Sequence, residues 1–142
     1  MKRKIVSFAL ACCFLFSGIW GNIQCVSAAN TENRAFSFDN SGSSGTGAWR
    51  DKNNSSKVYV HPLSGPDIYY TVQGRANTSA GGTKRSSKVV IPQGIEGSIT
   101  NYVKENNGIQ ARLKYDRITY GYVLTKGNWS PDSTRNYTIF GS

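Results

Sequence analysis

Residues 109–116 read IQARLKYD, and this stretch decides the expected fold class. Its apolar and polar residues alternate, with Ile109, Ala111, Leu113 and Tyr115 on one side and Gln110, Arg112, Lys114 and Asp116 on the other. Successive side chains of a β-strand point to opposite faces, whereas the side chains of a helix repeat about every 3.6 residues. The pattern therefore predicts a strand with one face against a core and the other in solvent.

Segments of similar composition occur along most of the chain. Residues 30–142 contain seven Val, seven Ile and eight Tyr against three Leu and no Met, and this composition favours sheet over helix. Further strands are expected at residues 34–38, 57–63, 67–74, 87–92, 118–125 and 136–140. The separators are rich in Gly, Ser, Pro and Asn, which form turns, at residues 64–67, 79–86 and 126–128.

This arrangement of short strands predicts an all-β fold. We expect a small antiparallel β-sandwich, with a partly open β-barrel as the alternative. One segment departs from the pattern, because Ile99, Tyr102 and Val103 have the spacing of a helix face. Ser98 is suited to cap the start of a helix there and Gly108 to end it, so a short helix is expected near residues 98–106.

The beginning of the chain has the three parts of a secretory signal peptide. Lys2, Arg3 and Lys4 are followed by an uncharged apolar run from Ile5 to Trp20. A more polar segment then ends in Val26-Ser27-Ala28-Ala29, with small residues where a signal peptidase reads. The alternative is an uncleaved membrane anchor, but the run is shorter than the ~20 residues that cross a bilayer. We predict that residues 1–29 are a signal peptide cleaved after Ala28 or Ala29. The protein is then secreted and extracellular, where it can associate with a cell wall.

Removal of this leader changes the chemistry of the chain. Cys12, Cys13 and Cys25 all lie within it, so the predicted mature chain has no cysteine for a disulfide, a nucleophile or a metal site. The net charge falls from +9 for the whole chain to +6 for residues 30–142, which is still basic. We expect residues 30–47 to hold an N-terminal strand and a flexible Gly/Ser-rich segment, and residues 48–142 to form the β domain.

Four short motifs carry a resemblance to a known family. They are Trp49-Arg50, Val58-Tyr59-Val60, ITNYVKEN at residues 99–106 and WSPDS at residues 129–133. In this order they resemble a family of small secreted proteins of Gram-positive bacteria that is catalogued as a domain of unknown function. The resemblance implies a short extracellular bacterial domain and transfers no activity or site residue. The signal peptide and the aromatic-rich β chain also give a looser similarity to secreted bacteriocins.

The two tryptophans of the predicted mature chain have two possible roles. Ser130-Pro131 favours a turn in which Asp132 or Ser133 bonds exposed backbone, and this turn would fix the direction of Trp129. An inward Trp129 would seal one end of the sandwich, which is the favoured interpretation because large aromatic side chains usually bury most of their surface. An outward Trp129, beside Tyr137 or Trp49, would form a platform for a sugar ring.

Basic residues are the clearest binding signal. Lys84, Arg85 and Lys88 cluster in one loop, and Arg112 and Lys114 alternate along the strand that begins at Ile109. A cationic surface outside a cell attracts anionic wall polymers, acidic glycans and anionic membrane surfaces. The alternative interpretation, without a binding role, is that these charges keep a β protein soluble and protect its sheet edges. Nucleic acid is not an expected partner, because no nucleic-acid-binding motif is present.

The sequence contains no recognisable catalytic constellation. His61 is the only histidine, and a hydrolase or nuclease would need it to meet acids such as Glu96 or Glu105, or Arg112, in space. One histidine without cysteine is too few for a zinc site, and the carboxylates show no calcium-loop spacing. We therefore predict a non-enzymatic protein without metal or cofactor.

The sequence leads to one main functional hypothesis. It is a secreted β domain that binds an anionic or glycan component of a cell envelope, with Trp49, Lys84, Arg85, Lys88, Arg112, Lys114 and Trp129 as candidate contacts. A bacteriocin-like protein that antagonises other bacteria is the alternative. A small secreted hydrolase or nuclease that uses His61 is the lesser alternative.

Overall fold

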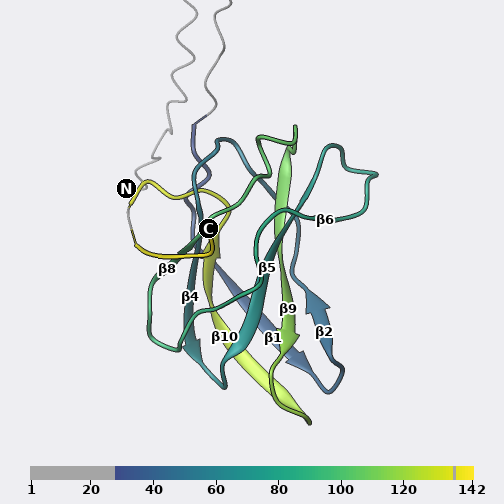
Figure 1. Cartoon of the computed structure of the whole chain (residues 1–142), viewed down its shortest axis with the longest axis vertical. Helices are drawn as coiled ribbons and strands as arrows, with labels where there is room; N and C mark the ends of the chain where they lie inside the picture. Colours follow the sequence, from purple (N-terminus) through teal and green to yellow (C-terminus); the bar gives the residue numbers. More distant parts are fainter. Residues whose placement is uncertain (1–27, 136) are drawn as a thin grey trace, which may run out of the picture.

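The alternation in residues 109–116 is realised in strand β9 (Gln110–Arg117) of a computed structural model, which describes residues 28–135 and 137–142. Ala111, Leu113 and Tyr115 are buried, whereas the residues between them are partly exposed. Strand β9 is the centre of one of two sheets. Figure 1 shows its position beside β5 and β2.

The strands form two sheets. Sheet A has the order β1 (Arg34–Asn40), β10 (Val123–Ser130), β4 (Val58–Ser64), β8 (Gly97–Ile99) and β11 (Thr138–Phe140). Sheet B has the order β2 (Ser44–Thr46), β9, β5 (Ile68–Arg75) and β6 (Thr83–Lys84), with β3 (Arg50–Asp51) on β9 and β7 (Val89–Val90) on β5. All of these pairs are antiparallel except β11 with β8.

The predicted all-β fold and the β-sandwich are confirmed. The two sheets share no strand, so the alternative of a barrel is not realised among the described residues. Side chains from both sheets meet in one core, and an aromatic cluster lies at its centre. The ring of Phe36 from sheet A lies 5.8 Å from Tyr70 and 5.5 Å from Tyr115, both of sheet B, between ring centroids. These contacts join the two layers.

Strand β10 corrects one sequence-based prediction. Residues 126–128 were expected to form a turn after a strand at 118–125, but β10 runs from Val123 through them to Ser130. Gly127 is required there for close packing, because a Cβ atom would lie 2.3 Å from the carbonyl oxygen of His61 and 2.7 Å from the ring of Phe36. The strand also shifts register between Lys126 and Gly127. The glycine therefore marks a close approach inside a strand.

The prediction of a short helix near residues 98–106 is wrong. Ser98 is buried within β8, and a series of turns follows up to Asn107, which has a φ of 58°. Asn101 organises these turns, because its side-chain amide donates to the carbonyl oxygen of Ile99 and its side-chain oxygen accepts from the amide of Val103. Ile99 enters the core from a strand and Val103 enters it from a turn. Their separation of four residues is therefore the same as on one face of a helix, although no helix forms.

Other boundaries differ in detail. The segment expected to be flexible before residue 48 includes β2, whose three residues pair with Lys114–Asp116 of β9. The strands expected at 87–92 and 136–140 are shorter, as β7 and β11. The predicted signal peptide falls almost wholly on residues 1–27, which lie outside the described residues. Within the described part, no helix has the length and apolarity needed to span a membrane.

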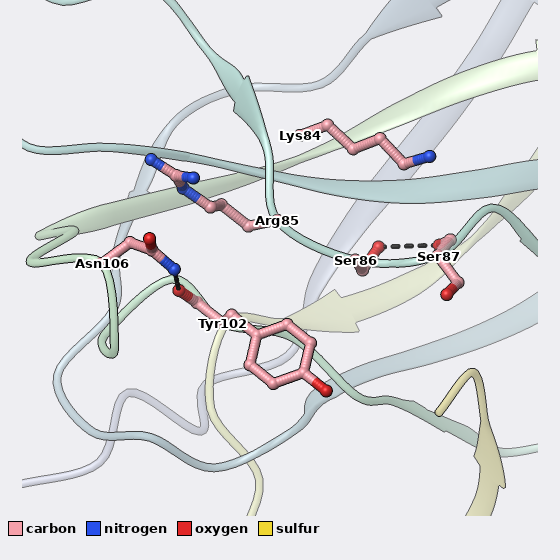
Figure 2. A pocket seen from close by; sticks show the side chains of 6 residues that line it. All are labelled: Lys84, Arg85, Ser86, Ser87, Tyr102 and Asn106. Carbon is pink, nitrogen blue, oxygen red and sulfur yellow. Dashed lines mark hydrogen bonds between the residues drawn. The ribbon is translucent and has the colours of Figure 1, made fainter.

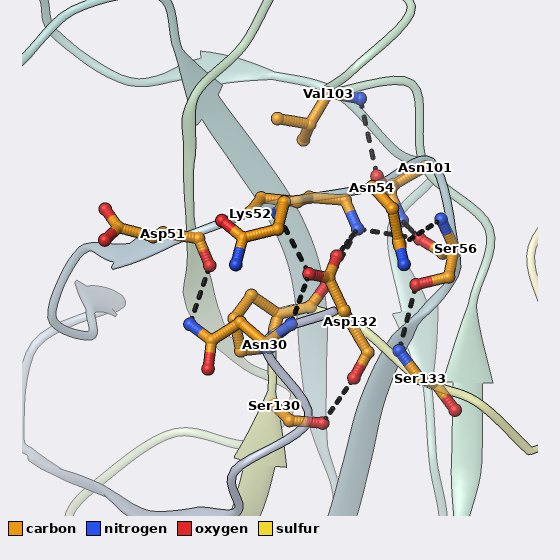
Figure 3. A network of polar contacts seen from close by, with 12 residues as sticks. Asn30, Asp51, Lys52, Asn54, Ser56, Asn101, Val103, Ser130, Asp132 and Ser133 are labelled. Carbon is orange, nitrogen blue, oxygen red and sulfur yellow. Dashed lines mark hydrogen bonds and ion pairs between the residues drawn. The ribbon is translucent and has the colours of Figure 1, made fainter. Parts of the chain in front are cut away.

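A buried ion pair joins the ends of the two sheets (Figure 3). Lys52, which follows β3 of sheet B, places its Nζ 2.8 Å from Oδ1 of Asp132, which follows β10 of sheet A. Both side chains are fully buried. The ammonium also donates to the carbonyl oxygens of Ser56 and Pro131, at 2.7 Å each. All three of its N–H groups therefore have acceptors, as burial of a charge requires.

The carboxylate of Asp132 is equally well satisfied. Its Oδ2 accepts hydrogen bonds from the backbone amides of Asn30, at 2.8 Å, and Asn53, at 2.9 Å. Asp132 thus bonds exposed backbone, as the sequence suggested, but the amides belong to segments distant in sequence. Burial lowers the pKa of Lys52, while the hydrogen bond and the charge of Asp132 oppose that change. The network fixes the C-terminal turn against the start of the domain.

Loss of the negative charge at Asp132 is expected to destabilise the fold strongly. Asp132→Asn leaves the buried ammonium of Lys52 without its counter-charge, which costs about 3–5 kcal/mol in comparable buried pairs. Urea unfolding followed by circular dichroism measures the free energy of unfolding. The matched control is Asp51→Asn on an exposed carboxylate nearby, which should change stability by about 0.5 kcal/mol or less. Equal stability of the two variants would contradict the role of the pair.

Gly127→Ala is expected to cost about 1–3 kcal/mol, because the added methyl group meets backbone that cannot move aside. Thermal unfolding compares this variant with Gly81→Ala, where a Cβ atom meets nothing within 4 Å. The control should be neutral or slightly stabilised, since alanine restricts the unfolded chain. An unchanged melting temperature in Gly127→Ala would show that the strand adapts to the methyl group.

Candidate functional site

The solvent-facing side of sheet B carries most of the predicted binding residues. Residues directly opposite each other in neighbouring strands lie on the same face. Lys84 of β6 and Arg112 of β9 both pair with Gln73 of β5, and Arg75 pairs with Gln110 in the next row. Lys114 lies one row further along β9, opposite Thr71. We call Arg75, Lys84, Lys88, Arg112 and Lys114 the cationic face.

Trp49 is the centre of this face. The guanidinium carbons of Arg75 and Arg112 each lie 4.4 Å from the centroid of its indole ring. Cations at this distance are attracted by the electron-rich face of the ring. Trp49 is half-buried and precedes β3, whose Asp51 pairs with Gln110 of β9. The short strand β3 therefore places the indole over the two arginines.

Glutamine side chains fix the same two guanidinium groups. Arg75 donates from Nε and one terminal nitrogen to Oε1 of Gln110, and from the other terminal nitrogen to the carbonyl oxygen of Thr78. Arg112 donates from Nε to Oε1 of Gln73, at 2.8 Å. Within the described ranges, the terminal nitrogens of Arg112 have no hydrogen-bond acceptor. They are free to donate to a ligand.

The electrostatics of the pair favour an anion. Neither Arg75 nor Arg112 forms an ion pair with any carboxylate of the described chain. The pKa of Arg112 is lowered, first by burial and then by the positive charge of Arg75. Two neighbouring like charges without counter-charge repel each other. An anion between or beside them would relieve this repulsion.

Lys88 and Lys114 differ from the arginines because they share a carboxylate. Their Nζ atoms lie 3.4 and 3.6 Å from the oxygens of Asp116. Lys88 also lies over the ring of Tyr69, 5.1 Å from its centroid. These lysines are partly exposed, so the pairs contribute little stability. The end of the cationic face near Asp116 is therefore partly neutralised, and the excess positive charge is concentrated at Arg75, Arg112 and Lys84.

A shallow pocket adjoins Lys84 at the edge of sheet B (Figure 2). Its volume is about 360 Å³, and its lining consists of Lys84, Arg85, Ser86, Ser87, Tyr102 and Asn106. Tyr102 is half exposed. In Figure 2 its ring lies below the Arg85–Ser87 segment. The pocket thus combines two cations, hydroxyl groups and an aromatic ring, and it shares Lys84 with the cationic face.

The backbone around this pocket is firmly held. The amide of Arg85 donates to the carbonyl oxygen of Val72, and the carbonyl oxygen of Arg85 accepts from the amide of Tyr102, at 2.8 Å each. Ser86 is buried, and its Oγ accepts from the amide of Val72. The guanidinium of Arg85 has no hydrogen bond or ion pair within the described chain. A fixed backbone therefore presents an unpaired cation.

The predicted site residues separate into two groups. Trp49, Lys84, Lys88, Arg112 and Lys114 lie together on one face of sheet B, with Arg85 in the adjoining pocket. Trp129 does not, because it is only 3 % exposed and belongs to the core. The inward orientation favoured for Trp129 is confirmed, although Trp129 and Trp49 both line a pocket of about 250 Å³ beside β1. The guanidinium of Arg50 lies over its ring, 5.3 Å from the centroid.

Sequence reasoning missed Arg75. The strand was expected to end at Gly74, although the alternation of Thr71, Gln73 and Arg75 continues by one residue. Extending that period would have placed Arg75 on the same face as Gln73. No local sequence pattern predicts the contact of Arg75 and Arg112 with Trp49. The two arginines lie on different strands and Trp49 precedes a third, so the contact depends on how these strands pair.

His61 does not meet the partners considered for it. It lies on β4 of sheet A opposite Asn128, whereas Arg112 lies on sheet B. Glu96 instead accepts a hydrogen bond from the hydroxyl of Tyr59, at 2.8 Å. The ring of Tyr59 lies 6.4 Å from that of His61, between centroids. Across residues 28–135 and 137–142, no three His, Cys, Asp or Glu side chains gather as ligands for a metal ion.

Comparisons with known proteins bear on the whole domain. A family model described as "Protein of unknown function (DUF2712)" matches residues 24–133. The match includes all strands from β1 to β10 and ends just after Asp132. Comparisons with curated proteins and with solved structures found no match.

The arginines beside Trp49 predict that anions reach its ring more readily than cations do. Relative to their quenching of free N-acetyltryptophanamide, we expect iodide to quench the fluorescence of Trp49 several-fold more strongly than caesium, because Arg75 and Arg112 attract the anion. The measurement compares Trp20→Phe with a Trp20→Phe, Trp49→Phe double variant, so that buried Trp129 is the common background. The iodide-sensitive fraction should disappear in the double variant. Equal quenching by iodide and caesium would contradict the excess of positive charge at Trp49.

Proposed function

We propose that this chain, which belongs to the DUF2712 family of proteins of unknown function, is a secreted β-sandwich that binds an anionic polymer of a cell envelope. The binding surface is the cationic face of sheet B together with the pocket at Arg85. The protein acts outside a Gram-positive cell, after removal of the leader, by binding and not by catalysis. The basic residues singled out in the sequence thus serve as contacts on one defined surface.

One observation carries the proposal. Arg75 and Arg112 lie over Trp49 at the same distance of 4.4 Å, and neither has a carboxylate partner among the described residues. Solvated surface charges need no such arrangement, because water stabilises them without fixed neighbours. Here the indole and two glutamines hold the guanidinium groups in place. A guanidinium fixed in this way loses little entropy when it binds a phosphate or carboxylate.

The distribution of charge favours a polymer over a small ion. Lys84 and Arg112 lie on either side of β5, so their backbones are separated by two strand spacings, about 10 Å. Arg85 extends the positive region beyond the sheet edge. Cations at such intervals match a ligand with repeated negative charges. Poly(glycerol phosphate), which carries one phosphate in each repeat, has this chemistry.

The surface is less suited to other ligands. Guanidinium groups already lie over Trp49, so the ring is not a free platform for a neutral sugar. Proteins that bind single-stranded nucleic acids stack successive bases on exposed aromatic rings. On this surface cations already lie over the rings of Trp49 and Tyr69, and Tyr102, in the pocket at the edge, is half exposed. A flexible phosphate polymer needs no stacking and depends on the cations alone.

Arg112→Gln is expected to weaken binding to poly(glycerol phosphate) about tenfold or more, because a hydrogen bond to a charged group contributes roughly 1.5–3 kcal/mol. Calorimetry at low and at physiological salt measures the affinity. The affinity of the unchanged protein should fall steeply with salt. The matched control is Lys126→Gln, which removes one exposed charge from β10 in sheet A. It should alter affinity far less than Arg112→Gln.

The same experiment includes dextran as a neutral polymer and single-stranded DNA as a different polyanion. We expect no binding to dextran and weaker binding to DNA than to poly(glycerol phosphate). Binding that is insensitive to salt would reject the electrostatic proposal. Equal effects of Arg112→Gln and Lys126→Gln would show that net charge, and not the arrangement at Trp49, determines binding.

A further inference from the structure

Asn30 lies at an unusual position relative to the buried ion pair. Its backbone nitrogen donates to Oδ2 of Asp132 at 2.8 Å, and its carbonyl oxygen accepts from the amide of Asp132 at 3.2 Å (Figure 3). Its side-chain amide also donates to the carbonyl oxygen of Asp51, at 2.8 Å. Its side-chain oxygen accepts from the guanidinium of Arg50, at 3.4 Å. Four hydrogen bonds therefore fix residue 30 against the core network, at the point where the predicted leader ends.

We propose that processing cuts the bond between Ala29 and Asn30, and that the new α-ammonium group of Asn30 forms an ion pair with Asp132. The inference rests on the proposed export, which supplies the peptidase. In the hydrolysis, water adds a hydroxyl group to the carbonyl carbon of Ala29 and a hydrogen to the nitrogen of Asn30. The resulting amine takes one proton from solvent. The backbone nitrogen of Asn30, which donates to Asp132 as a neutral amide, thereby becomes a positively charged ammonium group.

The geometry distinguishes the two predicted cleavage positions. A cut after Ala29 creates the ammonium at the nitrogen that already lies 2.8 Å from Oδ2 of Asp132. A cut after Ala28 would place it one residue away, and consecutive Cα atoms are about 3.8 Å apart. The nitrogen of Asn30 would then remain a neutral amide. Only the first cut adds a charge at the carboxylate.

The site is prepared for a second cation. Oδ1 of Asp132 faces Lys52, while Oδ2 accepts from two backbone amides and has no charged partner among the residues that the structure describes. Asn30 is partly exposed, so water can hydrate the remaining N–H groups of the ammonium. The cut removes one exposed hydrogen bond, from the side chain of Asn53 to the carbonyl oxygen of Ala28. A charge-assisted bond at the fully buried carboxylate of Asp132 outweighs the loss of one exposed hydrogen bond.

The proposal links removal of the leader to stability. An α-amino group has an ordinary pKa of about 7.7–8.0. An ion pair with Asp132 raises this pKa, whereas the positive charges of Lys52 and of Arg50, which donates to the side-chain oxygen of Asn30, oppose the rise. The added stability is therefore complete below about pH 7.7 and is lost as pH rises through the raised pKa. The unprocessed chain lacks this contribution at every pH. The fold becomes most stable only after the leader has been removed.

The first test identifies the N-terminus. The full chain is secreted from a Gram-positive host, and the product is analysed by intact mass and by sequencing of its N-terminal peptide. We expect a product that begins at Asn30. A product that keeps the leader would reject the export on which the inference rests. A product cut at another bond would reject the inference and leave binding to poly(glycerol phosphate) unaffected.

The second test measures the new charge. The product that begins at Asn30 is compared with one from a chain with an extra alanine inserted between Ala29 and Asn30, which displaces the ammonium by one residue. Near pH 8, acetic anhydride should label the α-amine of the first product about fivefold more slowly, because a rise of one unit in pKa from about 8 lowers the reactive, unprotonated fraction from about one half to about one tenth. Its melting temperature should also be higher. Equal labelling rates and melting temperatures would overturn the proposal.

Discussion

The buried pair of Lys52 and Asp132 is the constraint on which the rest of the arrangement depends. It joins the ends of the two sheets, β3 of sheet B and β10 of sheet A, through fully buried side chains. The hydrophobic core alone fixes the distance between the layers only loosely, because apolar contacts have no direction. A buried charge with every donor satisfied permits one relative position. The same pair holds the stretch that places Trp49 over sheet B.

Residues 49–52 illustrate how one short segment serves both the core and the surface. Arg50 and Lys52 point inward, where they bind the carbonyl oxygen of Trp129 and the carboxylate of Asp132. Trp49 and Asp51 point outward, toward Arg112 and Gln110. The alternation has the period of a strand, but its inward residues are charged and not apolar. A search for apolar alternation therefore does not detect the strand.

The sequence was most informative where a strand buries one apolar face. The alternation in β9, β4 and β5 predicted these strands and the fold class correctly. Prediction failed where a residue acts through a distant neighbour. Gly127 looks like a turn residue until Phe36 and the backbone at His61 are placed beside it. The cationic residues were identified from composition, whereas the arrangement at Trp49 depends on the pairing of β5 with β9 and could not be derived locally.

The separation of Lys52 and Asp132 in sequence also bears on the order of folding. They lie 80 residues apart, and β1 pairs with β10 over a similar length of chain. A polypeptide that emerges from a translocation channel in order would hold the ammonium of Lys52 without its counter-charge until residue 132 has passed. Within the described domain, the contacts of β1 with β10 and of Lys52 with Asp132 can therefore form only after nearly all of residues 34–132 have left the channel. If the chain is exported as proposed, this late closure of the core would favour passage through the channel before folding.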